Sequence, residues 1–88
     1  PPVLTCMGLS CKPNIDDLRE SPALFISEKL SHSLNILVVE PNIESHHFLQ
    51  LVPYLEGLKA DICVYLVAHN QFDIANVKEI DLDFCGLK

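Results

Sequence analysis

Basic side chains are scarce in this 88-residue sequence. It has six Lys and Arg against twelve Asp and Glu, a net charge of −6 at pH 7, and a single arginine, Arg19. Proteins that bind nucleic acids neutralise the phosphate backbone with clustered Lys and Arg. The composition therefore argues against a nucleic-acid partner.

Long apolar runs are also missing. The longest one, residues 62–68, is much shorter than the ~18 residues of a membrane-spanning helix. No charged-then-apolar leader with a small-residue cleavage site is visible, so we expect a soluble protein without a membrane partner. The chain has the length of one domain, and its composition is 49% hydrophobic and 20% charged, as in globular proteins.

The four cysteines form no CxxC pair, and most of them lie in apolar, strand-like runs. Free cysteines in such runs behave as small buried hydrophobic residues. We therefore expect a reducing, cytoplasmic location, although the even count leaves a disulfide pair possible.

Ser21 and Pro22 mark the start of a helix. Serine is a favourable N-cap, and proline suits the first helical position because its φ is preset and it needs no N–H partner. Ala23, Ile26 and Leu30 then recur at i, i+3 and i+7, which predicts that they face the core.

Several β-branched runs predict strands that are covered on both faces, as in parallel sheets. Their alternation with helices implies right-handed crossovers. We therefore expect an α/β fold, a Rossmann-like three-layer sandwich with a mostly parallel sheet of about five strands. The expected strands are 3–9, 35–41, 48–52, 62–67 and 82–85, and the expected helices are 22–32, 53–60 and 73–79.

A ligand of such a sheet binds beyond the carboxyl ends of the strands. The polar segment 10–21 follows the first strand, is long for a strand-to-helix connection, and contains Lys12 and Arg19. Gly8 is the only glycine in this turn, so neither the GxGxxG dinucleotide motif nor the GxxxxGK[ST] phosphate loop is present. We expect this chain not to bind NAD as a Rossmann half does.

Other polar residues are expected to lie outside the site. Glu40 ends the second strand, where dinucleotide-binding domains carry a ribose-binding acid, but without the glycine turn we expect a solvated acid. His46 and His47 are adjacent and point apart in a strand or a helix, so we expect no metal site. His69 follows a strand and either approaches a ligand or has a surface or cap role.

The segment 8–22 resembles a family signature. Its residues match the pattern G-[LF]-x-[FY]-K-x-x-x-x-D-x-R-x-S, which opens the C-terminal domain of the UDP-sugar 6-dehydrogenases. Segments 38–43 and 66–72 are more similar to the UDP-N-acetylmannosamine dehydrogenase branch than to the UDP-glucose branch, which stays the alternative. The matched positions of the signature are Gly8, Lys12, Asp17, Arg19 and Ser21.

This resemblance implies that residues 1–88 are the UDP-sugar-binding C-terminal domain of a larger NAD-dependent enzyme. Such enzymes oxidise the C6 alcohol of a UDP-sugar to a uronic acid, here for bacterial surface polysaccharide synthesis. NAD and the catalytic cysteine of the family belong to parts outside this segment. We therefore expect no catalytic residue and an inactive isolated chain, whose partners are a UDP-sugar and the rest of a cytoplasmic, homo-oligomeric parent.

The resemblance also implies residue roles. Lys12 is expected to bind the UDP diphosphate through charge-assisted hydrogen bonds, and Cys11 stands where the family has an aromatic residue beside the nucleotide. Lys88 is either the family's terminal basic residue displaced by one position or merely the last residue. Arg19 is expected at the seam with the NAD-binding part.

Three alternatives to these residue roles and to this function are considered. Arg19 could instead pair with Asp16 or Asp17 and brace the loop, leaving Lys12 solvated. Residues 36–42 look like the opening of a receiver domain, but Leu66 stands where the phospho-accepting aspartate is required. A stand-alone nucleotide-binding or interaction module is the remaining alternative.

Overall fold

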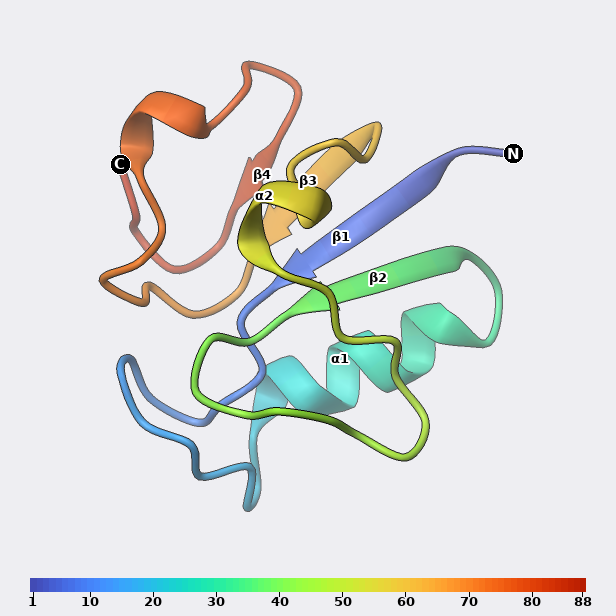
Figure 1. Ribbon diagram of the computed structural model, residues 1–88, viewed down its shortest axis with the longest axis vertical. Coiled ribbons are helices and arrows are strands. Elements are labelled where there is room, and N and C mark those ends of the chain that lie inside the picture. The colour runs from blue at the N-terminus through green and yellow to red at the C-terminus, as the bar shows by residue number, and fades with distance from the viewer.

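Four parallel strands form a single sheet in the computed structural model, which describes residues 1–88 (Figure 1). The strands are β1 (Val3–Met7), β2 (Asn35–Val39), β3 (Ile62–Tyr65) and β4 (Leu82–Asp83), in the spatial order β2-β1-β3-β4. The α/β, Rossmann-like fold is therefore confirmed, with four strands in place of about five. The segment expected as a further strand, 48–52, contributes only one parallel bridge between Leu51 and Val38.

The two α-helices lie on opposite faces of this sheet (Figure 1). Successive strand residues point to alternate faces: Cys6 and Val38 face α1 (Pro22–Ser31), whereas Met7 and Val39 face the side of α2 (Tyr54–Gly57). No helix is both long enough and apolar enough to cross a membrane. The three layers expected from the sequence are thus helix, sheet and helix.

Helix α1 begins where the sequence predicted. Ser21 is the N-cap, its Oγ accepts a hydrogen bond from an amide of the first turn, and Pro22 occupies the first position. The predicted inward stripe is partly wrong: Ile26 is 39% exposed, and Ser27 is buried in its place, together with Ala23. Small side chains at i and i+4 let the helix approach the sheet closely, which turns the larger Ile26 outward.

The predicted helix 73–79 is only a single 3₁₀ turn, η1 (Ile74–Asn76). The Asp73 carboxylate accepts from the Ala75 amide and starts the turn, but Val77 is already extended. The chain then bends so that the buried Asp81 accepts a hydrogen bond from the Cys63 amide at 2.9 Å. This contact anchors the segment before β4 to β3 and leaves no room for a longer helix.

All four cysteines are free thiols. Cys6 and Cys63 are completely buried within the sheet. Desolvation raises the pKa of the Cys6 thiol and raises the pKa of Cys63 to about 11. Both therefore serve as small apolar core residues, because a reactive thiol needs a lowered pKa and access to solvent.

Candidate functional site

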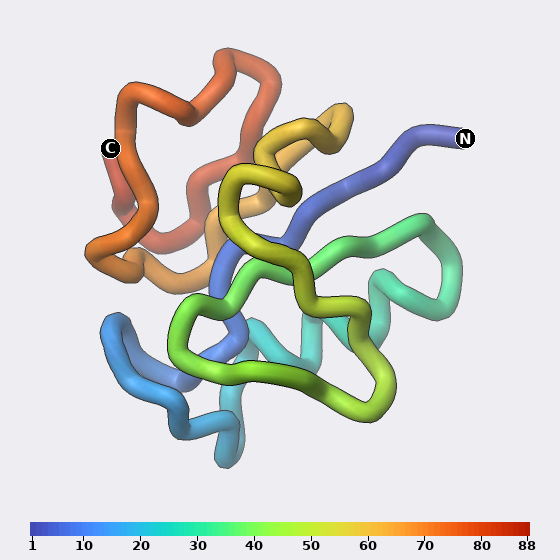
Figure 2. Tube along the Cα trace, viewed as in Figure 1, coloured from blue at the N-terminus to red at the C-terminus, as the bar shows by residue number.

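Three loops meet at the carboxyl edge of the sheet (Figure 2). They are residues 8–21 after β1, residues 40–50 after β2, and residues 66–73 after β3. The connection from β1 to β2 carries α1 on one face, and the connection from β2 to β3 carries α2 on the other. The strand order thus changes direction at β1, with β2 on one side of it and β3 on the other. Such a switch point is where open α/β sheets bind ligands.

Gly8 makes the turn that takes the chain out of β1. Its φ is +101°, and its amide donates to the Val39 carbonyl at 2.8 Å. A Cβ at this position would lie 2.6 Å from the Cβ of Val67. Only glycine satisfies both the backbone angle and the close approach. The structure thus explains why the signature has a glycine at this position.

Glu40 and His69 form a buried pair at the centre of the three loops. Nε2 of His69 lies 2.7 Å from Oε1 of Glu40, and both side chains are 0% exposed. The expectation that Glu40 is a solvated acid is therefore wrong, and so is a surface role for His69. Both residues follow strands that flank β1, so the sheet order buries them beneath the loop that leaves β1.

The buried carboxylate of Glu40 is fully hydrogen-bonded. Oε1 accepts from the amides of Leu9 and Ser10 at 2.8 and 3.0 Å, and Oε2 accepts from the amide of Asn42 at 3.0 Å. Burial alone would raise the pKa of Glu40, but these amides and His69 together outweigh it and lower the pKa. Glu40 is therefore a charged group whose partners all belong to the protein.

The residues at this edge do not fit a dinucleotide. An NAD-binding turn needs further glycines for close approach of the pyrophosphate, and here Ser10 and Cys11 follow Gly8 and Leu9. Glu40, which occupies the position of a ribose-binding acid, is committed to its own loops and is shielded from solvent. The residues of this edge therefore lack the features with which a Rossmann half holds NAD.

Lys12 lies on the loop after β1 with its side chain exposed. Its carbonyl accepts a hydrogen bond from Oγ of Ser10 at 2.6 Å, whereas its ammonium group takes part in no hydrogen bond or ion pair. The neighbouring Cys11 is half-buried, and its amide donates to the Asp17 carbonyl at 2.8 Å. The loop thus offers an uncommitted positive charge on an ordered backbone.

Arg19 pairs with Asp17, as one of the alternatives predicted. Nη2 of Arg19 lies 2.8 Å from Oδ2 of Asp17, and the Arg19 side chain is still 88% exposed. Its hydrogen bonds lower the pKa of Asp17 to about 2. An exposed pair of this kind stabilises a fold by only ~0–1 kcal/mol, so the guanidinium remains accessible to a second partner.

Lys88 lies apart from the residues of the loop. It follows β4, which is separated from β1 by β3. The Asp83 carboxylate accepts from the amides of Leu87 and Lys88 and folds the last residues into a turn. The structure therefore brings Cys11, Lys12 and Arg19 together and leaves Lys88 elsewhere.

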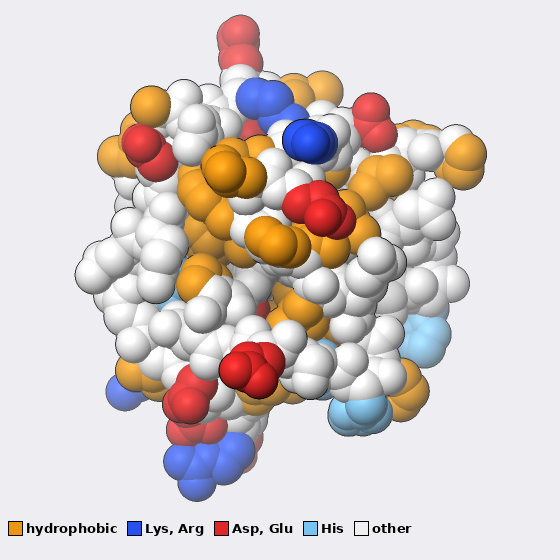
Figure 3. Space-filling model, in the orientation of Figure 1, with side chains coloured by type: hydrophobic (Ala, Val, Ile, Leu, Met, Phe, Trp, Pro, Cys, Tyr) orange, Lys and Arg blue, Asp and Glu red, His pale blue; other side chains and the backbone are white.

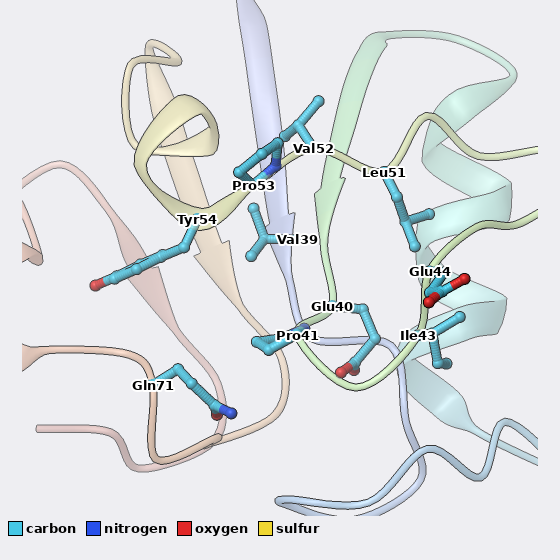
Figure 4. Close-up of a pocket in the computed structure, with 10 residues that line it drawn as sticks. All are labelled: Val39, Glu40, Pro41, Ile43, Glu44, Leu51, Val52, Pro53, Tyr54 and Gln71. Atoms are coloured by element: carbon cyan, nitrogen blue, oxygen red, sulfur yellow. The ribbon is translucent and has the colours of Figure 1, made fainter.

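A hollow of about 460 Å³ opens on the α2 side of the same edge. In Figure 4 Tyr54 and Gln71 stand on one side of it, and Ile43, Glu44 and Leu51 stand on the other. Figure 3 shows hydrophobic side chains gathered on this face, with Lys and Arg in separate places near its edges. The lining of the hollow contains two acidic residues, Glu40 and Glu44, and no Lys or Arg, which does not suit a phosphate.

The histidines form no metal centre. No three His, Cys, Asp or Glu side chains lie close enough together to hold a metal ion. The rings of His46 and His47 stack with centroids 4.6 Å apart, and Nδ1 of His46 accepts from the Phe48 amide. The pair therefore shapes the loop after β2.

Comparison with known protein families identifies the family of this chain. The model of the UDP-glucose/GDP-mannose dehydrogenase family, UDP binding domain, matches residues 5–83. The chain belongs to this family. The matched range begins within β1 and contains every later strand and helix and the loop with Lys12. The resemblance inferred from the loop signature is confirmed.

Three curated relatives indicate the branch of the family. UDP-N-acetyl-D-mannosamine dehydrogenase of Escherichia coli (strain K12) is 46% identical, over 83% of this chain and 19% of the relative. The enzyme of the same name from Campylobacter jejuni is 44% identical, over 81% and 20%. NDP-N-acetyl-D-galactosaminuronic acid dehydrogenase of Ralstonia nicotianae is 47% identical, over 81% and 18%.

The chain thus spans about a fifth of the length of the curated relatives that it matches. Relatives named for UDP-N-acetyl-D-mannosamine confirm the predicted similarity to that branch. No solved structure matches the chain.

Proposed function

We propose that this chain is the UDP-binding wall of an NAD-dependent UDP-sugar 6-dehydrogenase of the UDP-N-acetyl-D-mannosamine type. The observation that carries the proposal is the exposed, unpaired Lys12 on the signature loop of a chain that belongs to the family's UDP binding domain. A diphosphate carries about two negative charges, and charge-assisted hydrogen bonds to it are roughly twice as strong as neutral ones. Lys12 supplies that interaction.

The other signature residues have supporting roles. Cys11 flanks Lys12 and lies beside the nucleotide in place of an aromatic ring. Arg19, accessible although paired with Asp17, contacts the NAD-binding part of the parent. Lys88 lies after β4, away from the loop, and is either the family's terminal basic residue displaced by one position or merely the last residue of the segment.

The parent protein supplies the remaining chemistry. The segment outside this chain, about four fifths of each relative, holds NAD and the catalytic groups that oxidise the C6 alcohol to a carboxylate. The isolated chain is inactive for that reason, and the parent is a cytoplasmic homo-oligomer. The relative from Ralstonia nicotianae, named for a galactosaminuronic acid, supports a second candidate sugar of the same class.

Lys12→Ala should weaken UDP binding about tenfold or more, because a hydrogen bond to a charged group contributes ~1.5–3 kcal/mol. The affinity of the unmodified chain should be no better than about millimolar. This chain forms only one side of the binding crevice, so much of the UDP surface stays in contact with water. Titration of the labelled 88-residue chain with UDP, followed by NMR, measures both. Lys59→Ala, which removes an exposed lysine distant from the loop in sequence, is the matched control. Equal weakening in both variants, or in neither, would contradict the role of Lys12.

A further inference from the structure

The buried pair of Glu40 and His69 controls where the loop after β1 can lie. Oε1 of Glu40 accepts from the amides of Leu9 and Ser10, at the start of this loop. The ring of His69 lies beside the same oxygen, 2.7 Å away, and its other nitrogen points toward residue 14. The pair thus contacts the loop on both sides of Lys12.

The hydrogen bonds define the proton positions on His69. Nδ1 accepts from the amide of Asn14 at 2.8 Å, and the side-chain amide of Asn42 lies 3.4 Å from the same nitrogen. Since Nδ1 faces donors, the ring proton belongs on Nε2, which donates it to Glu40. The imidazole therefore joins a carboxylate on one side to a loop amide on the other.

Asn14 is the second fixed point of the loop. Its φ is +63°, a left-handed conformation that Asn tolerates better than most residues. Its side-chain oxygen accepts from the Asn70 amide at 2.8 Å, while its own amide donates to His69. The loop that follows β3 thus holds Asn14 through two hydrogen bonds.

Lys12 stands midway between these fixed points. Ser10 is bound to Glu40, Asn14 is bound to His69, and the Lys12 carbonyl accepts from the Ser10 hydroxyl. The backbone of Lys12 is therefore held before any ligand arrives, although its side chain is free in solvent. A binding group on a pre-ordered backbone loses less conformational entropy when it binds.

We propose that Glu40 and His69 act as positioning residues that hold the loop after β1 in the conformation in which Lys12 meets the UDP diphosphate. This inference rests on the proposed function of the site. The ring of His69, which follows β3, contacts Glu40 at the end of β2 and Asn14 of the loop, and so fixes the loop relative to these two strands. Neither Glu40 nor His69 touches the ligand.

Two substitutions of His69 separate positioning from a purely structural role. The amide nitrogen of His69→Gln can reach the place of Nε2 and keep Glu40 paired, but no acceptor remains for the Asn14 amide. The oxygen of His69→Asn can reach the place of Nδ1 and keep the Asn14 contact, but Glu40 loses a partner. We expect His69→Gln to bind UDP about tenfold more weakly, and His69→Asn to stay within about threefold of the unmodified chain.

Stability should follow the opposite order. His69→Asn should unfold at lower urea concentration than His69→Gln, because it leaves the buried carboxylate with fewer partners. His32→Gln, at an exposed histidine without a side-chain hydrogen bond, is the control and should change neither quantity. Affinity that follows stability across the two variants would overturn the positioning role.

A measurement on the unmodified chain decides the matter even if both variants fail to fold. Hydrogen exchange should show the Asn14 amide protected before UDP is added, with His69 unprotonated at Nδ1 in its ring ¹⁵N spectrum. An Asn14 amide that exchanges freely and becomes protected only with UDP would overturn the proposal, since the ligand would then order the loop. A protected amide in a chain that never binds UDP would leave the loop contact intact and refute the proposed function instead.

Discussion

Replacing Glu40 by alanine should lower the free energy of unfolding by at least about 3 kcal/mol, because each buried donor left unpaired costs about 1–3 kcal/mol. The amides of Leu9 and Ser10 and the ring N–H of His69 would all lose their acceptor. A domain of this length has a total stability of only about 4–13 kcal/mol at 0.05–0.15 kcal/mol per residue. Urea unfolding followed by circular dichroism measures the change.

Glu44→Ala is the matched control for this substitution. Glu44→Ala removes the same charge from the same loop. The Glu44 side chain, however, is exposed and takes part in no hydrogen bond or ion pair. Its effect should stay within about 0.5 kcal/mol, as for most surface substitutions. If Glu40→Ala were as mild as Glu44→Ala, the carboxylate would not be what holds the three loops together.

Replacing Gly8 by alanine should have an effect of similar size on stability. The left-handed φ of +101° costs a residue with a side chain about 1–3 kcal/mol. The new methyl group would also lie 2.6 Å from the Val67 Cβ and 3.0 Å from its backbone nitrogen, and such overpacking costs about 1–3 kcal/mol. The loop after β1 would have to shift, so UDP binding should weaken too.

Gly86→Ala separates backbone strain from steric conflict. Gly86 has a φ of +73°, but nothing lies within 4 Å of where its Cβ would be. This variant should lose only the strain component, about 1–2 kcal/mol, when both glycine variants are compared by urea unfolding. Equal losses in the two variants would show that the contact with Val67 has no energetic importance.

Local patterns predicted the frame of the fold. The start of α1 could be predicted from two neighbouring residues, Ser21 and Pro22. The strands β2 and β3 could each be predicted from one continuous β-branched run. Where an outcome depended on distant contacts, the prediction was wrong. Ile26 turned outward because Ser27 packs near Cys6, and the helix expected at 73–79 shrank because Asp81 binds the amide of Cys63.

The buried pair could not be read from one segment. Glu40 and His69 are 29 residues apart, and each looks like a polar residue at the end of a strand. Only the order β2-β1-β3 places the two strand ends on either side of the loop after β1. A search for the first polar residue after each strand that flanks a central first strand would have found both. The signature loop itself was found because its residues are close together in the sequence.

The most direct test of the account is a map of the amide shifts that UDP causes in the labelled 88-residue chain. We expect the largest shifts in residues 8–21, centred on Lys12, with smaller ones in residues 66–73, which hold the loop through His69 and Asn70. The spectrum of β2 should change little, because Glu40 is occupied in the free chain. Shifts centred on Val52 and Tyr54 in the hollow beside α2, or no shifts at UDP concentrations several times above millimolar, would contradict the assignment of this edge as a UDP site.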